Sequence, residues 1–211
     1  MILSVHDRPT LTLLEKKMVF HHVNTGGILA FPTDTVYGIG TKAGIDLSVR
    51  RMVQLKNRDR CKPFILLGSS ISQFLPYVAF PSLLEHPLLQ KHWPGPLTAV
   101  LPFQKSSGLF IGAENPETIG VRIPNHSLLL DLLSFLGFPL LTTSANPSGS
   151  FPLNKGEAIQ EWFISATSEK AFILDTGSGE SIPSTVVRLT DGEQVEILRE
   201  GKLTKETIYQ S

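Results

Sequence analysis

The segment FPLLTTSANPSG, residues 138–149, joins an apolar run to a dense group of polar residues. The apolar run predicts a buried strand, which here ends in hydroxyl groups, an amide and a glycine. Ligands of α/β proteins bind where the strands of a sheet end, because hydrogen-bond donors and acceptors converge there. The segment therefore predicts a strand that ends in a binding site for polar ligand groups.

Two other segments have a similar character. GILAFPTDTVYG, residues 27–38, is again an apolar run that opens into hydroxyl groups. LKNRDRCKP, residues 55–63, lies at the end of a basic stretch, because residues 50–62 contain six basic residues and one acidic residue, Asp59. Clustered cations beside hydroxyl and amide groups indicate an anionic, phosphate-bearing ligand. The alternative for the basic stretch alone is a solvated helix end.

Length and composition indicate one globular domain, expected over residues 1–211. The chain contains 41% hydrophobic and 18% charged residues, which is enough for a full core and argues against global disorder. The formal net charge is zero, so the chain as a whole is not a polycation built to bind nucleic acid.

The cysteine content and the N-terminus predict a cytoplasmic protein. Cys61 is the single cysteine of the chain, so it cannot form an internal disulfide bond, as is typical of a reducing compartment. No apolar stretch is long enough to cross a bilayer, and residues 1–7 lack the charged start and apolar block of a signal peptide.

Hydrophobic periodicity predicts alternating helices and strands, and hence an α/β sheet of mixed direction. Helices are expected over residues 11–24, capped by Thr10 and ended by Gly26, over 82–92, disturbed at Pro87, and over 125–135 and 155–164. A further helix, capped by Asp46, is expected to carry Val49, Met52, Val53 and Lys56 on one face. Strands are expected over residues 28–31, 63–67, 97–103, 118–124, 138–143, 171–174, 185–189 and 194–199.

Two cations have a defined place in this pattern. Lys56 continues the stripe formed by Val49, Met52 and Val53, so its stem should cover the core while its ammonium reaches out. Arg122 should point away from the sheet face that its apolar neighbours cover, because strand residues alternate between faces.

The chain lacks the common signatures of other site classes. Neither the P-loop pattern nor the G-x-G-x-x-G fingerprint is present, and no serine lies in a G-x-S-x-G elbow. The six histidines do not pair at metal-binding spacing, and one cysteine makes a structural zinc site very improbable.

Six blocks together resemble the YrdC-like threonylcarbamoyl-AMP synthases, in their short, single-domain form. In chain order these are PTDTVYG (32–38), KNR with KP (56–58 and 62–63), WPGPLT (93–98), GVRIP (120–124), SANPSG (144–149) and STVV (184–187). The chain departs from this family at Asp59, where many members have proline, and at Leu67, where some members have a histidine.

The resemblance implies an open, twisted sheet of mixed parallel and antiparallel strands with flanking helices and a deep central cavity. It implies an enzyme, a nucleotidyltransferase, that converts L-threonine, bicarbonate and ATP into threonylcarbamoyl-AMP and pyrophosphate. The product would serve N6-threonylcarbamoyladenosine formation in tRNA through a separate threonylcarbamoyl transferase complex. Weak binding of tRNA by the chain itself is compatible with this activity, and a membrane partner is not expected.

The resemblance also implies the residues of the site. Catalytic roles fall to Lys56 and Arg58. ATP would be bound by Arg58, Lys62, Thr118, Ser144, Asn146 and Arg199. Threonine would be bound by Thr35, Arg122, Thr142 and Ser184. Mg²⁺ is expected on the phosphates, held largely by substrate oxygens and water, with no protein metal site.

Each assignment has an ordinary structural alternative. Ser144 and Asn146 could cap a following helix, and Thr35 could cap a turn. Arg122 could be an exposed residue of a half-solvated strand, and Arg199 could lie on a plain surface strand. For the whole chain, the alternatives are a non-catalytic protein that binds tRNA or ribosomal RNA and a carbamoyl-transfer domain.

Overall fold

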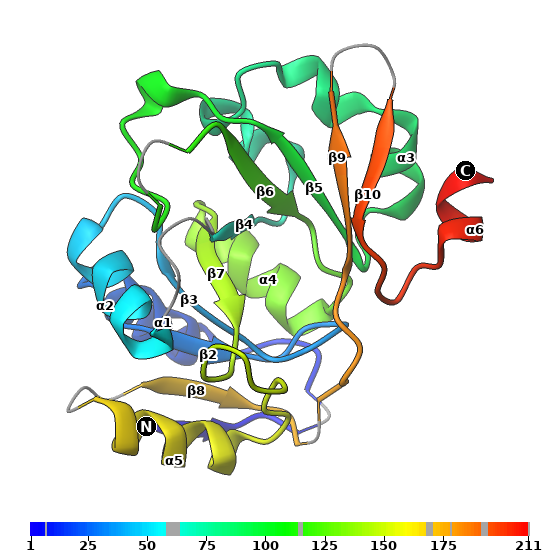
Figure 1. Cartoon of the computed structure of the whole chain (residues 1–211). Helices are drawn as coiled ribbons and strands as arrows, with labels where there is room; N and C mark the ends of the chain where they lie inside the picture. Colours follow the sequence, from blue (N-terminus) through cyan, green and yellow to red (C-terminus); the bar gives the residue numbers. More distant parts are fainter. Residues whose placement is uncertain are drawn as a thin grey trace.

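The fold is a single curved sheet with helices on both faces, as Figure 1 shows for the computed structural model of the chain. The structure describes residues 1–6, 8–57, 64–113, 116–167, 171–177, 179–190 and 194–210. The predictions for Arg58, Asp59, Cys61 and Lys62 lie outside these residues.

Ten strands of the described chain form the sheet, in the order β1-β8-β2-β3-β7-β4-β6-β5-β9-β10. Four neighbouring pairs are parallel (β1 with β8, β8 with β2, β4 with β6, β5 with β9) and the other five are antiparallel. The predicted sheet of mixed direction is thus confirmed. The strands are β1 (Ile2–Ser4), β2 (Leu29–Phe31), β3 (Gly38–Lys42), β4 (Ile65–Leu67), β5 (Leu97–Pro102), β6 (Thr118–Arg122), β7 (Leu140–Ser144), β8 (Phe172–Asp175), β9 (Thr185–Leu189) and β10 (Val195–Arg199).

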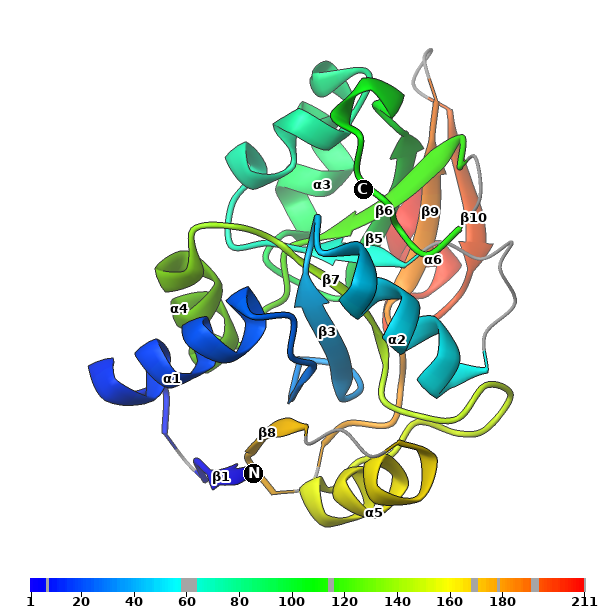
Figure 2. The ribbon, with the colours of Figure 1, turned by 90° about the vertical axis from the view of Figure 1, so that its left-hand side faces the viewer.

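The helices divide the hydrophobic core into two layers. Helices α1 (Leu13–Asn24) and α4 (Ser127–Leu136) lie side by side on one face, as Figure 2 shows, and bury their apolar residues with Phe31 of β2. The larger core cluster includes buried residues of α2 (Asp46–Lys56), α3 (Pro87–His92) and α5 (Gly156–Ala166). A sixth helix, α6 (Lys205–Tyr209), and four 3₁₀ helices, η1 (Ile71–Gln73), η2 (Leu75–Tyr77), η3 (Pro81–Glu85) and η4 (Lys105–Ser107), complete the described elements.

The predicted caps Thr10 and Asp46 are wrong, by two residues and by one residue respectively. Helix α1 is capped by Thr12, whose hydroxyl accepts from Glu15 N while the Glu15 carboxylate accepts from Thr12 N, a reciprocal capping box. Asp46 is the first residue of α2 and does not cap it, since Ile45 holds the cap position. The disturbance at Pro87 is confirmed, because the segment divides there into η3 and α3.

Two strands and one α-helix were not predicted, and neither were the 3₁₀ helices η1, η2 and η4. Strand β3 contains two glycines in five residues, a composition that weakens a strand signal. Strand β1 has three residues and gains its place by pairing with β8, 170 residues away along the chain. Helix α6 spans five residues and carries little periodicity.

The expected deep cavity stays a prediction. Among the described residues no helix is long and apolar enough to span a membrane.

Candidate functional site

Lys56, Ser144 and Asn146 form one polar group, here named the Lys56 cluster. Lys56 ends α2 below the buried Val49 and Met52, and its side chain is only 2% exposed. Its Nζ donates to Ser144 O at 2.8 Å and to Asn146 Oδ1 at 2.8 Å, and lies 3.5 Å from Ser144 Oγ. The ammonium is therefore buried against the residues that end and follow β7. The prediction that it reaches outward from the core is wrong.

The loop after β7 is closed by the Asn146 side chain. Its Nδ2 donates to Pro147 O at 2.9 Å and to Ser150 O at 2.6 Å, while Ser144 Oγ donates to its Oδ1 at 2.6 Å. The alternative that Ser144 and Asn146 cap a helix is wrong, because the next helix, α5, begins at Gly156. The two side chains instead hold a compact loop against a buried cation.

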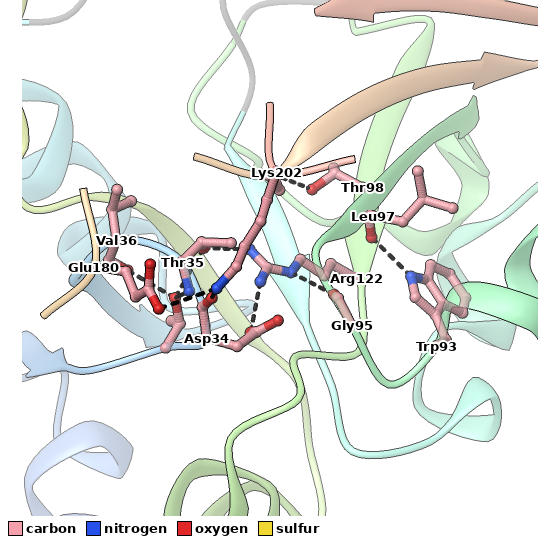
Figure 3. Close-up of polar contacts among 12 residues, drawn as sticks. Asp34, Thr35, Val36, Trp93, Gly95, Leu97, Thr98, Arg122, Glu180 and Lys202 are labelled. Carbon is pink, nitrogen blue, oxygen red and sulfur yellow. Dashed lines mark hydrogen bonds and ion pairs between the residues drawn. The ribbon is translucent and has the colours of Figure 1, made fainter. Parts of the chain in front are cut away.

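Arg122, Asp34, Thr35 and Gly95 form a second group, here named the Arg122 cluster (Figure 3). Arg122 ends β6 and is 4% exposed, so the alternative of an exposed strand residue is wrong. Its three nitrogen atoms have separate partners: Nε donates to Gly95 O at 3.0 Å, Nη1 to Thr35 Oγ1 at 2.8 Å and Nη2 to Asp34 Oδ1 at 2.6 Å.

Two effects act in opposite directions on the pKa of Arg122. Burial lowers the pKa of the Arg122 guanidinium, and the neighbouring Asp34 carboxylate acts to raise it. A guanidinium nevertheless stays protonated in proteins, so Arg122 and Asp34 form a buried ion pair.

Local chain geometry positions the partners of Arg122. Thr33 Oγ1 accepts from Thr35 N at 3.0 Å and donates to Val36 O at 2.7 Å, the turn-forming role that the sequence allowed for this loop. Thr35 is thereby turned toward Arg122. Gly95 supplies the partner of Arg122 Nε. No larger residue fits at this position, because a Cβ would lie 2.3 Å from His92 O. Only glycine lets this turn bring its carbonyl to Arg122 Nε.

The C-terminal strands border the Arg122 cluster. Ser184 Oγ lies 2.9 Å from Thr98 Oγ1, and Arg199 Nη2 donates to Ser184 O at 2.9 Å. Arg199 lies in an exposed position on β10, as its surface alternative requires, yet its guanidinium folds back on Ser184. Lys202 Nζ donates to Asp34 O at 2.9 Å and pairs with Glu180 at 3.1 Å, which ties the C-terminal segment to the loop after β2 (Figure 3).

The remaining predicted residues lie on the central strands. Thr142 is buried on β7, two residues before Ser144, and its Oγ1 donates to Ile65 O at 3.3 Å. Thr118 begins β6, four residues before Arg122, and the contacts described for it are those of the strand pairing with Pro102. The structure thus groups Lys56 with Ser144 and Asn146, and Thr35 with Arg122, and it places Thr118 in neither cluster.

Sequence reasoning missed several residues of the site. Asp34 carried a readable signal, since it is the one carboxylate between two hydroxyl residues in PTDTVYG. Thr98 ends the WPGPLT block, but its contact with Ser184 could not be read from it. Lys202 carried no signal, because only the folded chain brings it to Asp34 O, and Glu180, which contacts Lys202, belongs to neither cluster. Among the described residues, no group of three or more His, Cys, Asp or Glu side chains could hold a metal ion.

A family model matches most of the chain. The model of the Sua5/YciO/YrdC family, described as "Telomere recombination", matches residues 21–201.

Two curated relatives are named threonylcarbamoyl-AMP synthase. A threonylcarbamoyl-AMP synthase of Pseudoalteromonas atlantica is 32% identical over 165 residues, covering 77% of this chain and 86% of that protein. A threonylcarbamoyl-AMP synthase of Vibrio campbellii is 30% identical over 187 residues, covering 88% of this chain and 98% of that protein.

Solved structures of similar fold include Sua5 of P. abyssi and YciO of E. coli, each at 25% identity or more. Sua5 of P. abyssi, crystallised with L-threonine, matches with a TM-score of 0.87 at 30% identity over the whole of this chain. This chain spans 60% of the length of that protein. YciO of E. coli matches with a TM-score of 0.83 at 25% identity, covering 99% of this chain and 98% of YciO.

Proposed function

Because the chain belongs to the Sua5/YciO/YrdC family, we propose that it is an L-threonylcarbamoyladenylate synthase, a nucleotidyltransferase. It converts L-threonine, bicarbonate and ATP into threonylcarbamoyl-AMP and pyrophosphate. Its relatives named threonylcarbamoyl-AMP synthase and the similar Sua5 crystallised with L-threonine support this activity. Residues 1–211 act as a single domain, a proposal supported by one sheet that includes both β1 and β10.

The observation that carries the proposal is the buried Arg122 beside the Thr35 hydroxyl. A guanidinium has five N–H donors, and the three bonds described for Arg122 use one donor each. The other two form a fork for the carboxylate of L-threonine, since arginine binds carboxylates in a bidentate manner. Thr142 and Ser184 border the amino acid from the neighbouring strands.

ATP lies at the Lys56 cluster in this proposal. Lys56 and Arg58 stabilise the charge that develops on the α-phosphate and on the leaving pyrophosphate. Arg58, Lys62, Thr118, Ser144, Asn146 and Arg199 bind the nucleotide, as the family resemblance implies. Support comes from the short contacts of the Lys56 ammonium with the loop of Ser144 and Asn146. Mg²⁺ would be held by phosphate oxygens and water.

The reaction needs positioning more than a covalent nucleophile. The α-ammonium of threonine loses a proton to solvent. The resulting amine attacks the carbon of bicarbonate, water leaves, and a carbamate forms. A carbamate oxygen then attacks the α-phosphorus of ATP in line, and pyrophosphate departs. The adenylate passes to a separate threonylcarbamoyl transferase complex, which modifies tRNA, while this chain binds tRNA weakly.

Pyrophosphate release tests this function. The purified protein should release pyrophosphate from ATP only when L-threonine and bicarbonate are both present. L-Serine should be a poorer substrate, because a missing methyl group in a fitted pocket costs roughly 1–3 kcal/mol. Release at the same rate without threonine and bicarbonate would contradict the proposal.

Incubation with tRNA separates the synthase from its partner. With ATP, threonine and bicarbonate but no transferase, nucleoside analysis should find little modified adenosine. Efficient modification without a partner would contradict the division of labour.

A further inference from the structure

The carboxylate of Asp34 has an oxygen atom that the roles proposed above leave unused. Asp34 Oδ1 accepts from Arg122 Nη2 at 2.6 Å. Asp34 Oδ2 has less than 1 Å² of exposed surface and no hydrogen-bond partner among the described residues. A buried acceptor without a donor costs free energy, and more so when it is charged. A ligand that brings a donor to this carboxylate would recover that cost.

The charge of the pair indicates which ligand this is. Arg122 contributes one positive charge and Asp34 one negative charge, so the ion pair is neutral as a unit. A lone arginine would attract any carboxylate, whereas a guanidinium beside a carboxylate complements a zwitterion. L-Threonine at neutral pH is such a zwitterion, with a carboxylate and an ammonium on the same carbon.

We propose that Asp34 accepts the α-ammonium of L-threonine while Arg122 holds its carboxylate, so that the site selects an amino acid over a hydroxy acid. This inference rests on the proposed function and adds a residue that decides specificity. Asp34 follows the buried Thr33 and precedes Thr35, so the ammonium acceptor and the proposed threonine-binding hydroxyl come from one loop.

The surroundings of Asp34 suit this role. Its side chain is 12% exposed although Oδ2 itself is buried, so another part of the side chain forms its solvent-facing side. The torsion about the Cβ–Cγ bond of aspartate is soft, so a small rotation presents Oδ2 to that side. Lys202 donates to the backbone oxygen of Asp34 and pairs with Glu180, so its ammonium is directed away from the carboxylate.

The nearest histidine does not compete for Asp34 as a cation. The Nδ1 atom of His126 is also buried without a partner among the described residues. Burial lowers the pKa of this imidazole, and the charge of Asp34 opposes the shift. A neutral His126 at pH 7 leaves the negative charge of Asp34 to Arg122 and to the ligand.

Calorimetric titration of the whole protein tests the role of Asp34. The two ligands are L-threonine and 2,3-dihydroxybutyrate, in which a hydroxyl replaces the ammonium. The wild type should bind L-threonine at least about 10-fold more tightly, the lower end of what a hydrogen bond between charged groups contributes. In Asp34→Asn this preference should fall below about threefold, mainly through weaker binding of L-threonine. The matched control is Glu180→Gln. It removes the carboxylate that pairs with Lys202, the lysine that donates to Asp34 O, and it should keep the wild-type preference.

Two further outcomes keep the test decisive when Asp34→Asn does not fold. Asp34→Glu retains the charge and should retain a preference above about 10-fold for the ammonium ligand. A folded Asp34→Glu without that preference, or a wild type that does not distinguish the two ligands, overturns the inference. A wild type that binds L-threonine with no effect of Asp34→Asn refutes the role of Asp34 alone. A wild type that neither binds L-threonine nor releases pyrophosphate refutes the proposed function instead.

Discussion

The Lys56 cluster and the Arg122 cluster each hold a buried cation, but they hold it by different means. Lys56 donates to the carbonyl oxygen of Ser144, which ends β7, and to the amide oxygen of Asn146, two residues later. Arg122 is held by the loop after β2, the turn at Gly95 and a carboxylate, which lie 27 to 88 residues from it in sequence. The comparison teaches that the second cluster depends on the whole sheet, so substitutions there should damage stability and function together.

Arg122→Ala should have the largest effect. Removing one partner of a buried ion pair costs about 3–5 kcal/mol, because the other charge stays buried. The rate of threonine-dependent pyrophosphate release should also fall at least about 100-fold, because the variant lacks the guanidinium that binds the threonine carboxylate with two hydrogen bonds. Urea denaturation and a pyrophosphate assay measure the two effects.

The control for Arg122 is an exposed pair on the same sheet. Arg188 Nη1 lies 2.7 Å from Glu196 Oε2, and both side chains are more than 40% exposed. Arg188→Ala should change the free energy of unfolding by less than about 1 kcal/mol and leave activity unchanged. Equal losses in the two variants would show that burial does not decide the value of these pairs.

Lys56→Met should separate stability from function. Methionine keeps the apolar stem among Val49 and Met52 but removes the ammonium. Turnover should fall about 100-fold or more if the charge acts on the phosphates, whereas stability should fall by only about 1–3 kcal/mol for the lost charged hydrogen bonds. Lys42→Met is the control, since Lys42 is bonded to Asn24 outside the cluster and its loss should leave turnover intact.

Ser144→Asp should weaken ATP binding about tenfold or more in a folded protein, since a like charge against phosphate is costly. The new carboxylate would lie against Asn146 Oδ1, which accepts the 2.6 Å bond from Ser144 Oγ in the wild type, and two acceptors repel each other. Lys56 Nζ, which lies 3.5 Å from Ser144 Oγ, offsets this repulsion, so the variant should still fold. Calorimetric titration with ATP measures the affinity. Ser148→Asp adds the same charge to the exposed part of the loop, and a similar loss of affinity there would remove the special place of Ser144.

Glu15→Gln, far from both clusters, should have the smallest effect. The hydrogen bond from Arg8, with further bonds from Thr12, lowers the pKa of Glu15 from 4.5 to about 2. Since the folded pKa is the lower one, Glu15 stabilises the protein above pH 4.5, and this contribution is lost as the pH falls toward 2. The variant should be less stable by under about 1 kcal/mol at pH 7, because the Arg8 side of the pair is solvent-accessible.

Stability measured between pH 7 and pH 2 checks the sign. The difference between wild type and Glu15→Gln should shrink as the pH falls, and pyrophosphate release should be equal. A difference that grows at low pH would contradict the assigned cause of the shift.

Most of the fold could be predicted from the sequence because long periodic segments carry their own signal. The apolar stripe of α2, the β-branched residues of β6 and the apolar run of β7 each carry a local signal, and the structure forms the predicted element at each. Strands β1 and β3 escaped, since three residues or a glycine-rich sequence gain their conformation from pairing with neighbours.

The two clusters divide in the same way. The sequence by itself determined that hydroxyl, amide and cationic residues gather at strand ends, because residue type and local period decide where a strand stops. Only the tertiary structure decided that Arg122 is buried against Asp34 and that Lys202 closes on the same loop. The alternation of a strand predicts which side of the sheet a residue faces. Whether that side meets water or a carboxylate depends on distant segments, since Asp34 is 88 residues from Arg122 and 168 residues from Lys202.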